Sequence, residues 1–83
     1  MTETIFELDL RGLRCPLPAL RTEKQLRGMT AGERVSVLTD DPLAAIDIPH
    51  FCREAGHPMI ATSVENGHRH FVIECKGPDT GSE

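Results

Sequence analysis

The residues best suited to chemistry surround one cysteine, Cys15, in residues 13–19, LRCPLPA. A residue that precedes proline is pushed away from helical backbone angles, and proline is favoured at the first helical position. The sequence therefore predicts that Cys15 is the N-cap of a helix and Pro16 its first residue. Pro16 and Pro18 lack an N–H group, so we expect the Leu17 N–H to be directed at the Cys15 sulfur.

The expected surroundings of Cys15 favour a reactive thiol. The positive end of the helix and the nearby Arg11 and Arg14 favour the thiolate, so the pKa of Cys15 is expected to fall below the ordinary value of ~8.5. The alternative, a buried and inert cysteine, explains neither the two prolines nor the flanking arginines. We therefore expect a partly exposed, nucleophilic Cys15.

The other cysteines and the histidines give weaker signals. Cys52 shares an apolar helical face with its neighbours, and Cys75 alternates with Phe71 and Ile73, so both are expected in the core. No zinc-type spacing links these cysteines with the histidines, and we expect neither a metal site nor a bound cofactor.

Length and charge limit the function classes. The 83 residues suffice for one domain, predicted over 1–76, and the polar residues 77–83 are predicted to form a disordered tail. A net charge of -4 disfavours direct binding to nucleic acid. The chain has no leader pattern and no apolar run that could span a membrane, so we expect a cytoplasmic protein with reduced thiols.

Hydrophobic periodicity predicts the order βαβαββ. Strands are expected over 5–10, 34–39, 59–65 and 68–76, and Asn66-Gly67 is a strong signal for a hairpin turn. One helix follows Cys15 and ends near Gly28. Asp41 is expected to cap the second helical region with Pro42 at its first position, and Pro49 to interrupt it. We therefore predict a short turn to about residue 47 and a helix over 48–55, capped by Asp47.

Two helices cannot cover both faces of a four-stranded sheet. The predicted fold is therefore an α+β two-layer sandwich, a mixed sheet with both helices packed on one face. In the first helix, Ala19, Thr22, Leu26 and Met29 share the side that should face the sheet.

Leu17 lies well off this stripe and Leu20 at its margin. Together they either form an apolar docking surface beside the thiol, flanked by Arg21 and Lys24, or simply complete the core. Periodicity does not separate these two interpretations. For Asp40 we expect a polar contact to a partner.

The run Asp9-Leu10-Arg11-Gly12-Leu13-Arg14-Cys15-Pro16-Leu17-Pro18, together with Asp40-Asp41-Pro42, Asp47-Ile48-Pro49 and Phe51-Cys52, resembles the TusA family of small sulfur carriers, also called SirA-like. The resemblance extends from about Phe6 to Cys75. It implies a sheet like that of the C-terminal domain of the third bacterial translation initiation factor, in which the last strand is antiparallel to the others.

The resemblance also implies an activity. Cys15 would carry sulfane sulfur as a transient persulfide, Pro16 and Pro18 would shape the first turn, and Gly12 and Arg14 would shape the approach. The sulfur donor would be a protein of the cysteine desulfurase or rhodanese type. The acceptor would be a second protein that serves tRNA thiolation, cofactor assembly or sulfur oxidation.

A sulfurtransferase of the persulfide-carrier type is thus the predicted function, and transfer would follow the logic of thiol–disulfide exchange. Residues considered for partner contacts are Arg11, Leu17, Leu20, Arg21, Lys24 and Asp40. The chain is expected to act as a monomer. The rival interpretation is a redox-sensing or regulatory docking module that uses Cys15 and the surface of Leu17 and Leu20 without transferring sulfur.

Overall fold

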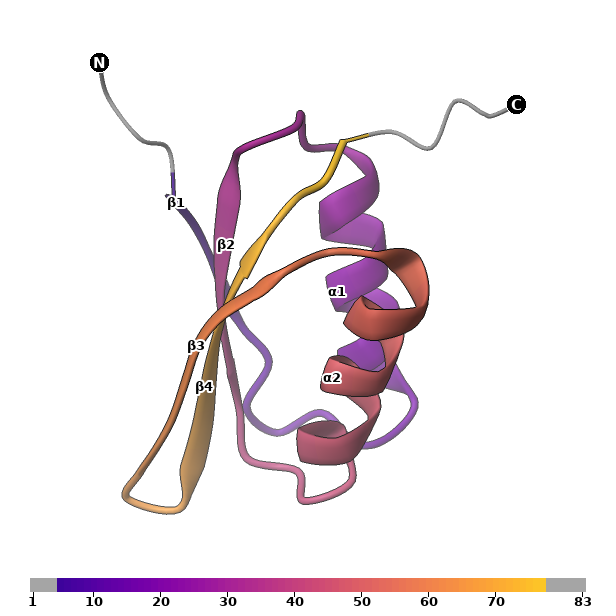
Figure 1. Cartoon of the computed structure of the whole chain (residues 1–83). Helices are drawn as coiled ribbons and strands as arrows, with labels where there is room; N and C mark the ends of the chain where they lie inside the picture. The colour runs from indigo at the N-terminus through magenta and orange to yellow at the C-terminus, as the bar shows by residue number, and fades with distance from the viewer. Residues whose placement is uncertain (1–4, 78–83) are drawn as a thin grey trace.

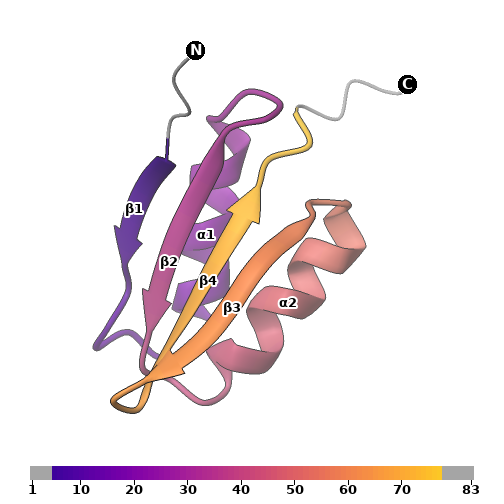
Figure 2. The same ribbon diagram turned by 60° about the vertical axis from the view of Figure 1, so that its left-hand side comes forward.

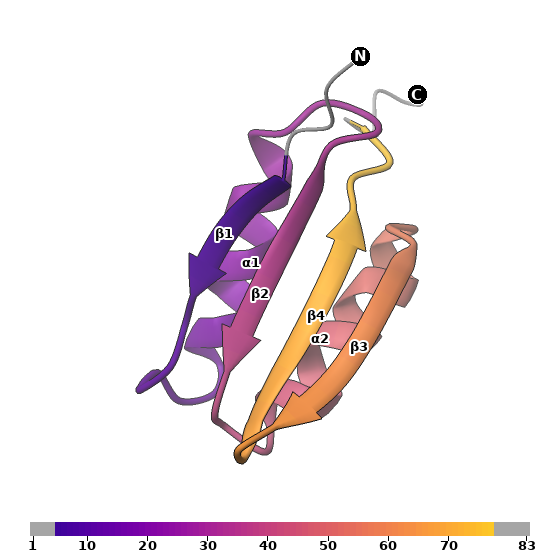
Figure 3. The ribbon, with the colours of Figure 1, turned by 90° about the vertical axis from the view of Figure 1, so that its left-hand side faces the viewer.

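The computed structural model describes residues 5–77, which form two layers (Figure 1). The elements in chain order are β1 (Ile5–Asp9), α1 (Leu17–Arg27), β2 (Arg34–Thr39), α2 (Ala44–Ala55), β3 (Met59–Glu65) and β4 (His68–Glu74). The sheet order is β1-β2-β4-β3, and both helices cover the same face of it (Figures 2 and 3). The predicted α+β sandwich is confirmed.

Strand directions follow from the connections. β1 and β2 are parallel because α1 crosses between them, whereas β4 is antiparallel to both of its neighbours, β2 and β3. The last strand is therefore antiparallel to all the others, as the resemblance implied. Asn66 and Gly67 turn β3 into β4 with positive φ angles of 52° and 78°, which confirms the predicted hairpin.

The core lies between the helices and the inner face of the sheet. On β2, Val35 and Val37 are fully buried, and they pair across the sheet with Ile73 and Phe71 of β4. The buried apolar residues are Leu10, Leu26, Met29, Val35, Val37, Ala44, Ile48, Cys52, Phe71, Ile73 and Cys75. The alternation of β2 and β4 thus places one face of each strand against the helices.

The prediction that Pro49 interrupts the second helix is wrong, because α2 continues from Ala44 to Ala55 with Pro49 inside it. An internal proline removes one backbone hydrogen bond and crowds the preceding turn, at a cost of roughly 3 kcal/mol. Ala44, Ile48 and Cys52 recur every fourth residue and are all buried against the core. Their burial offsets the proline, so tertiary packing overrides the local preference.

The end of the domain differs slightly from the prediction. Gly77, placed in the predicted tail, is buried, and its N–H lies 3.3 Å from the Cys75 sulfur. A Cβ atom at Gly77 would stand 3.0 Å from the Ala31 Cβ, so this close approach requires glycine. The rest of the predicted tail, 78–83, lies outside the described residues.

The topology brings the starts of both helices to one end of the molecule. Each helix follows a strand that is parallel to the other, so α1 and α2 both begin at the end where β1 and β2 finish (Figure 1). The loop that carries Cys15 and the loop after β2 meet there. This end of the fold therefore assembles residues from distant parts of the sequence.

Replacing Ile48 tests the packing of α2. Ile48→Ala should lower the free energy of unfolding by about 2–5 kcal/mol, because it opens a cavity under a fully buried side chain. Ile46→Ala is the matched control on the same helix, since Ile46 is 66% exposed and should change stability by less than about 0.5 kcal/mol. Urea denaturation followed by circular dichroism measures both. Equal effects would contradict the assigned face of α2.

Candidate functional site

Cys15 lies just before α1, one residue before the N-cap position that was predicted for it. Pro16 is the N-cap, with φ -96° and ψ 12°, and the helix begins at Leu17. The Leu17 N–H donates to the Arg14 carbonyl oxygen at 2.8 Å and not to the Cys15 sulfur. The predicted N-cap role of Cys15 is therefore wrong, because a tight turn over 14–17 precedes the helix and uses this donor. Cys15 remains exposed.

The backbone of Cys15 is held by a carboxylate from the loop after β2. The Cys15 N–H donates to Asp41 Oδ2 at 2.6 Å, across 26 residues of sequence. Asp41 is only 5% exposed, and its other oxygen, Oδ1, accepts the Leu43 N–H at 3.3 Å. Asp41 therefore binds the turn that leads into α2 and joins this turn to the cysteine loop. The prediction that Asp41 is the helix cap with Pro42 as the first helical residue is wrong, because this turn precedes the helix and Leu43 is the N-cap of α2.

The side chain of Cys15 meets a second carboxylate. The Cys15 thiol donates to Asp47 Oδ2, with the sulfur 2.9 Å from the oxygen, and Asp47 stands in the first turn of α2. The hydrogen bond to Asp47, burial, and the negative charges of Asp47 and Asp41 together raise the pKa of Cys15 above its ordinary value. The predicted fall in pKa is therefore wrong. The hydrogen bond to Asp47 and the charges of the two carboxylates favour the protonated thiol.

The two arginines expected to stabilise the thiolate are engaged elsewhere. Arg11 binds Asp9 through two hydrogen bonds, of 2.9 and 2.7 Å, and these lower the pKa of Asp9 to about 2. Arg14 lies 3.5 Å from Asp40, which also accepts the Gly12 N–H at 3.0 Å. Asp40 therefore contacts the loop before Cys15 within the chain, and neither guanidinium has a recorded contact with the sulfur.

Exposed apolar side chains surround the starts of the two helices. Leu17 and Leu20 of α1 are 43% and 51% exposed, so they do not complete the core. Leu43 and Ile46, at the start of α2, are 55% and 66% exposed. We call these four residues the apolar patch. The contact between Cys15 and Asp47 joins the loop before α1 to the first turn of α2, so the thiol lies near the starts of both helices.

Sequence reasoning missed half of this site. It assigned Asp47 only to a helix cap and did not consider Leu43 or Ile46, because the predicted break at Pro49 removed the first turn of α2. The i, i+4 spacing of Asp47 and Leu43 on an uninterrupted helix would have been the available signal.

The remaining predicted site residues flank this centre. Pro18 is buried, and its carbonyl oxygen accepts the Thr22 hydroxyl at 2.8 Å, whereas Pro16 is exposed. Arg21 and Lys24 are exposed on α1, beyond Leu17 and Leu20.

The other two cysteines are in the core, as predicted. Cys52 is 1% exposed, and burial raises its pKa to about 11. The Cys75 sulfur, also 1% exposed, lies 3.5 Å from the Leu26 carbonyl oxygen and 3.6 Å from that of Met29. Neither thiol can meet another protein without a change in the fold.

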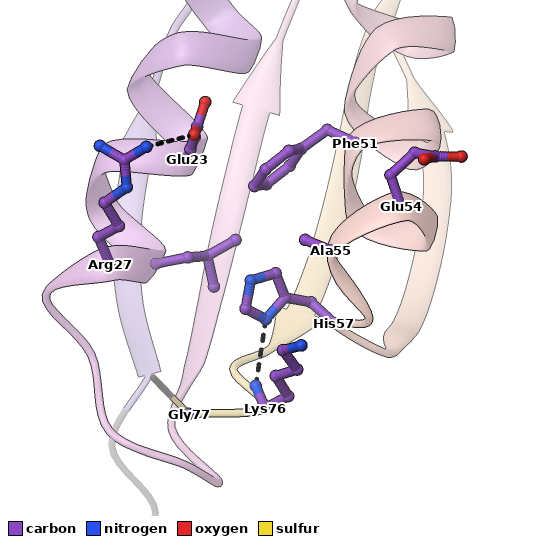
Figure 4. Close-up of a pocket in the computed structure, with 9 residues that line it drawn as sticks. Glu23, Arg27, Phe51, Glu54, Ala55, His57, Lys76 and Gly77 are labelled. Carbon is purple, nitrogen blue, oxygen red and sulfur yellow. Dashed lines mark hydrogen bonds and ion pairs between the residues drawn. The ribbon is translucent and has the colours of Figure 1, made fainter. Parts of the chain in front are cut away.

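A separate hollow of about 410 Å³ lies near the opposite ends of the helices (Figure 4). Phe51 and Ala55 line it, with His57 and Lys76 beside them. His57 Nδ1 accepts the Lys76 N–H at 3.1 Å, and burial and the Lys76 charge lower the pKa of His57. Cys15 and its carboxylates are not among the lining residues, so the hollow is distinct from the thiol site.

Within residues 5–77, no group of three or more histidine, cysteine, aspartate or glutamate side chains is arranged to hold a metal ion. No helix in the same range is long and apolar enough to cross a membrane.

Comparisons with known proteins show the family to which the chain belongs. The family model described as "Sulfurtransferase TusA" matches residues 6–75. The chain is 38% identical over 68 residues to the sulfur carrier protein TusA of Allochromatium vinosum, a match that covers 82% of this chain and 90% of that protein. The chain belongs to the TusA family.

The fold agrees with a solved structure of the same kind. The crystal structure of a SirA-like protein from Desulfitobacterium hafniense superposes with a TM-score of 0.74 at 26% identity, and covers 86% of this chain and 96% of that chain. The TusA-family match begins within β1 and ends at Cys75, so it includes the cysteine loop, the loop after β2 and both helices.

Asp41 can be tested as the anchor of the cysteine loop in this TusA-family chain. Asp41→Ala should lower the free energy of unfolding by about 1–3 kcal/mol, because it leaves the N–H groups of Cys15 and Leu43 without their acceptor. Amide hydrogen exchange at Cys15 should also accelerate. Asp40→Ala is the control, since Asp40 is less buried and its contacts are exposed. Unchanged exchange at Cys15 in Asp41→Ala would contradict the anchoring role.

Proposed function

We propose that the chain is a sulfur carrier that accepts sulfane sulfur from a donor protein as a persulfide on Cys15 and passes it to an acceptor protein. The observation that carries the assignment to Cys15 is its exposure, since Cys52 and Cys75 are buried. Membership of the TusA family supports the relay function. In this role the chain acts as a sulfurtransferase of the persulfide-carrier type.

The chemistry is a thiol exchange. The Cys15 thiolate attacks the terminal sulfur of the donor persulfide, so one S–S bond forms and the donor S–S bond breaks. The donor cysteine leaves as a thiolate and takes up a proton, while Cys15 now bears the persulfide. An acceptor thiolate then attacks the same sulfur and regenerates Cys15. No oxidant or reductant is consumed, and the transient persulfide replaces a cofactor.

The apolar patch is the proposed docking surface for donor and acceptor. Exposed apolar residues grouped around a reactive atom favour contact with another protein, because their burial stabilises the complex. Leu17 and Leu20 contribute from α1, and Arg21, Lys24 and Arg14 supply exposed cationic groups nearby. Asp40 and Arg11 act from within the chain, by holding the approach to the thiol.

The finer assignments rest on the resemblance to the TusA family. The donor is a cysteine desulfurase or a rhodanese-type protein, and the acceptor serves tRNA thiolation, cofactor assembly or sulfur oxidation. A relay that depends on a free thiol needs a reducing compartment, which places the protein in the cytoplasm. It acts as a monomer and needs neither a membrane nor direct contact with nucleic acid.

Intact-protein mass spectrometry tests the carrier role. After incubation with a cysteine desulfurase and free cysteine, the protein should gain the mass of about one sulfur per chain, in a form removed by reductant. Cys15→Ser should abolish this gain, because the hydroxyl cannot form a persulfide. Cys52→Ala is the matched control and should retain the gain, since Cys52 is buried. No gain in the wild type with donors that load other carriers would favour the regulatory docking module.

The docking surface can be tested separately from the thiol. Leu20→Asn should slow sulfur transfer from the protein donor about tenfold, which corresponds to a loss of about 1.4 kcal/mol in the encounter complex. Ile60→Asn on β3 is the control, because Ile60 is 42% exposed and lies outside the patch. Iodoacetamide should alkylate Cys15 equally fast in both variants. Equal transfer rates in the two variants would remove Leu20 from the interface.

A further inference from the structure

Asp47 contacts the Cys15 sulfur and, in the part of the chain that the structure describes, has no cationic partner. Its Oδ2 lies 2.9 Å from the Cys15 sulfur, yet no lysine or arginine among the described residues pairs with it. The other charged groups near Cys15 are Asp41, which binds its N–H, and Arg14, which is engaged with Asp40. A carboxylate without a cationic partner among the described residues therefore lies beside the thiol, at the start of α2.

We propose that Asp47 holds Cys15 as a neutral thiol until a docked partner places a lysine or arginine side chain against the Asp47 carboxylate, which releases the thiol for attack. Asp47 is thus a positioning residue and a selector of partners. This inference rests on the proposed sulfur-carrier function, and it adds the chemistry that donor and acceptor must share.

The need for a cation follows from burial. A partner that covers Cys15 and Leu43 removes water from Asp47 as well, because Asp47 contacts the Cys15 sulfur and stands one helical turn after Leu43. A buried carboxylate without a partner is strongly disfavoured, so a productive complex has to pair it. A protein that lacks the cation would bury Asp47 unpaired, and this free-energy cost weakens its binding.

The same ion pair changes the state of the thiol. With its charge compensated, Asp47 no longer favours the protonated sulfur, and the Cys15 proton leaves to solvent or to the departing donor thiolate. The balanced reaction is Cys15–SH plus donor–S–SH giving Cys15–S–SH plus donor–SH. In the free protein the thiolate fraction stays low, which limits reaction with other electrophiles. The higher pKa of Cys15 in the free protein agrees with this resting state.

The first test needs no partner. The rate of alkylation by iodoacetamide is measured against pH for the wild type and Asp47→Asn, with folding checked by circular dichroism. Asp47→Asn should shift the profile to lower pH, since a neutral amide does not oppose the thiolate. A shift of one pH unit raises the thiolate fraction about tenfold, and the rate about threefold after its lower nucleophilicity is included. Glu54→Gln, the same charge change at the far end of α2, should leave the profile unchanged.

The second test supplies the partner's cation from within the chain. Leu43 stands one helical turn before Asp47 and is exposed, so a lysine there can reach the carboxylate. Leu43→Lys should shift the alkylation profile in the same direction as Asp47→Asn, whereas Leu43→Gln should not. In the double variant Leu43→Lys/Asp47→Asn, the lysine should shift the profile by clearly less than Leu43→Lys shifts it when Asp47 is present.

The outcomes separate the two proposals. If Asp47→Asn and Leu43→Lys both show the same alkylation profile as the wild type, the role of Asp47 is overturned, even if Cys15 still loads with sulfur. If the profiles shift as expected but no variant gains sulfur from a desulfurase, the inference about the thiol stands and the carrier function fails. If Leu43→Lys shifts the profile to the same extent without Asp47, the lysine acts on the thiol directly and the ion-pair mechanism is overturned.

Discussion

The site depends on one buried carboxylate, that of Asp41. One of its oxygens binds the Cys15 N–H and the other binds the Leu43 N–H, while its own N–H donates to the Thr39 hydroxyl. A buried carboxylate is tolerated only where hydrogen bonds satisfy it, and here these bonds come from the cysteine loop and from the turn before α2, while the backbone of Asp41 is bound to the end of β2. The position of the cysteine loop is therefore tied to the end of β2.

The sheet topology explains why such a tie is possible. The parallel pairing of β1 and β2 places the two loops that follow them at one end of the molecule, and each helix starts from that end. Charges there are sorted into pairs. Arg11 neutralises Asp9 and Arg14 approaches Asp40, whereas Asp47 faces the thiol without a cation from residues 5–77. The sulfur is consequently presented to partners in an exposed but protonated form.

The three cysteines show how burial divides one kind of side chain into two roles. Cys52 and Cys75 pack as small apolar groups, and burial raises the pKa of Cys52 to about 11. Cys15 also has a raised pKa, but for a different main reason, since it is exposed and the largest cause is its hydrogen bond to the carboxylate of Asp47, which a partner can neutralise. A thiol suppressed by burial stays inert, whereas a thiol suppressed by a surface charge can be switched on by docking.

The sequence by itself determined the order of the elements, the single layer of helices, the hairpin at Asn66 and Gly67, and the exposure of Cys15, because these depend on local periodicity, turn chemistry and the prolines around one thiol. It misjudged Pro49, since a local rule cannot weigh the burial of Ile48 and Cys52 against one missing hydrogen bond. It also misjudged the pKa of Cys15. Arg11 and Arg14 are close to Cys15 in sequence, but the groups that decide its protonation, Asp41 and Asp47, are 26 and 32 residues away. Only the tertiary structure decided which charges reach the sulfur, because electrostatic energies depend on distance in space and not along the chain.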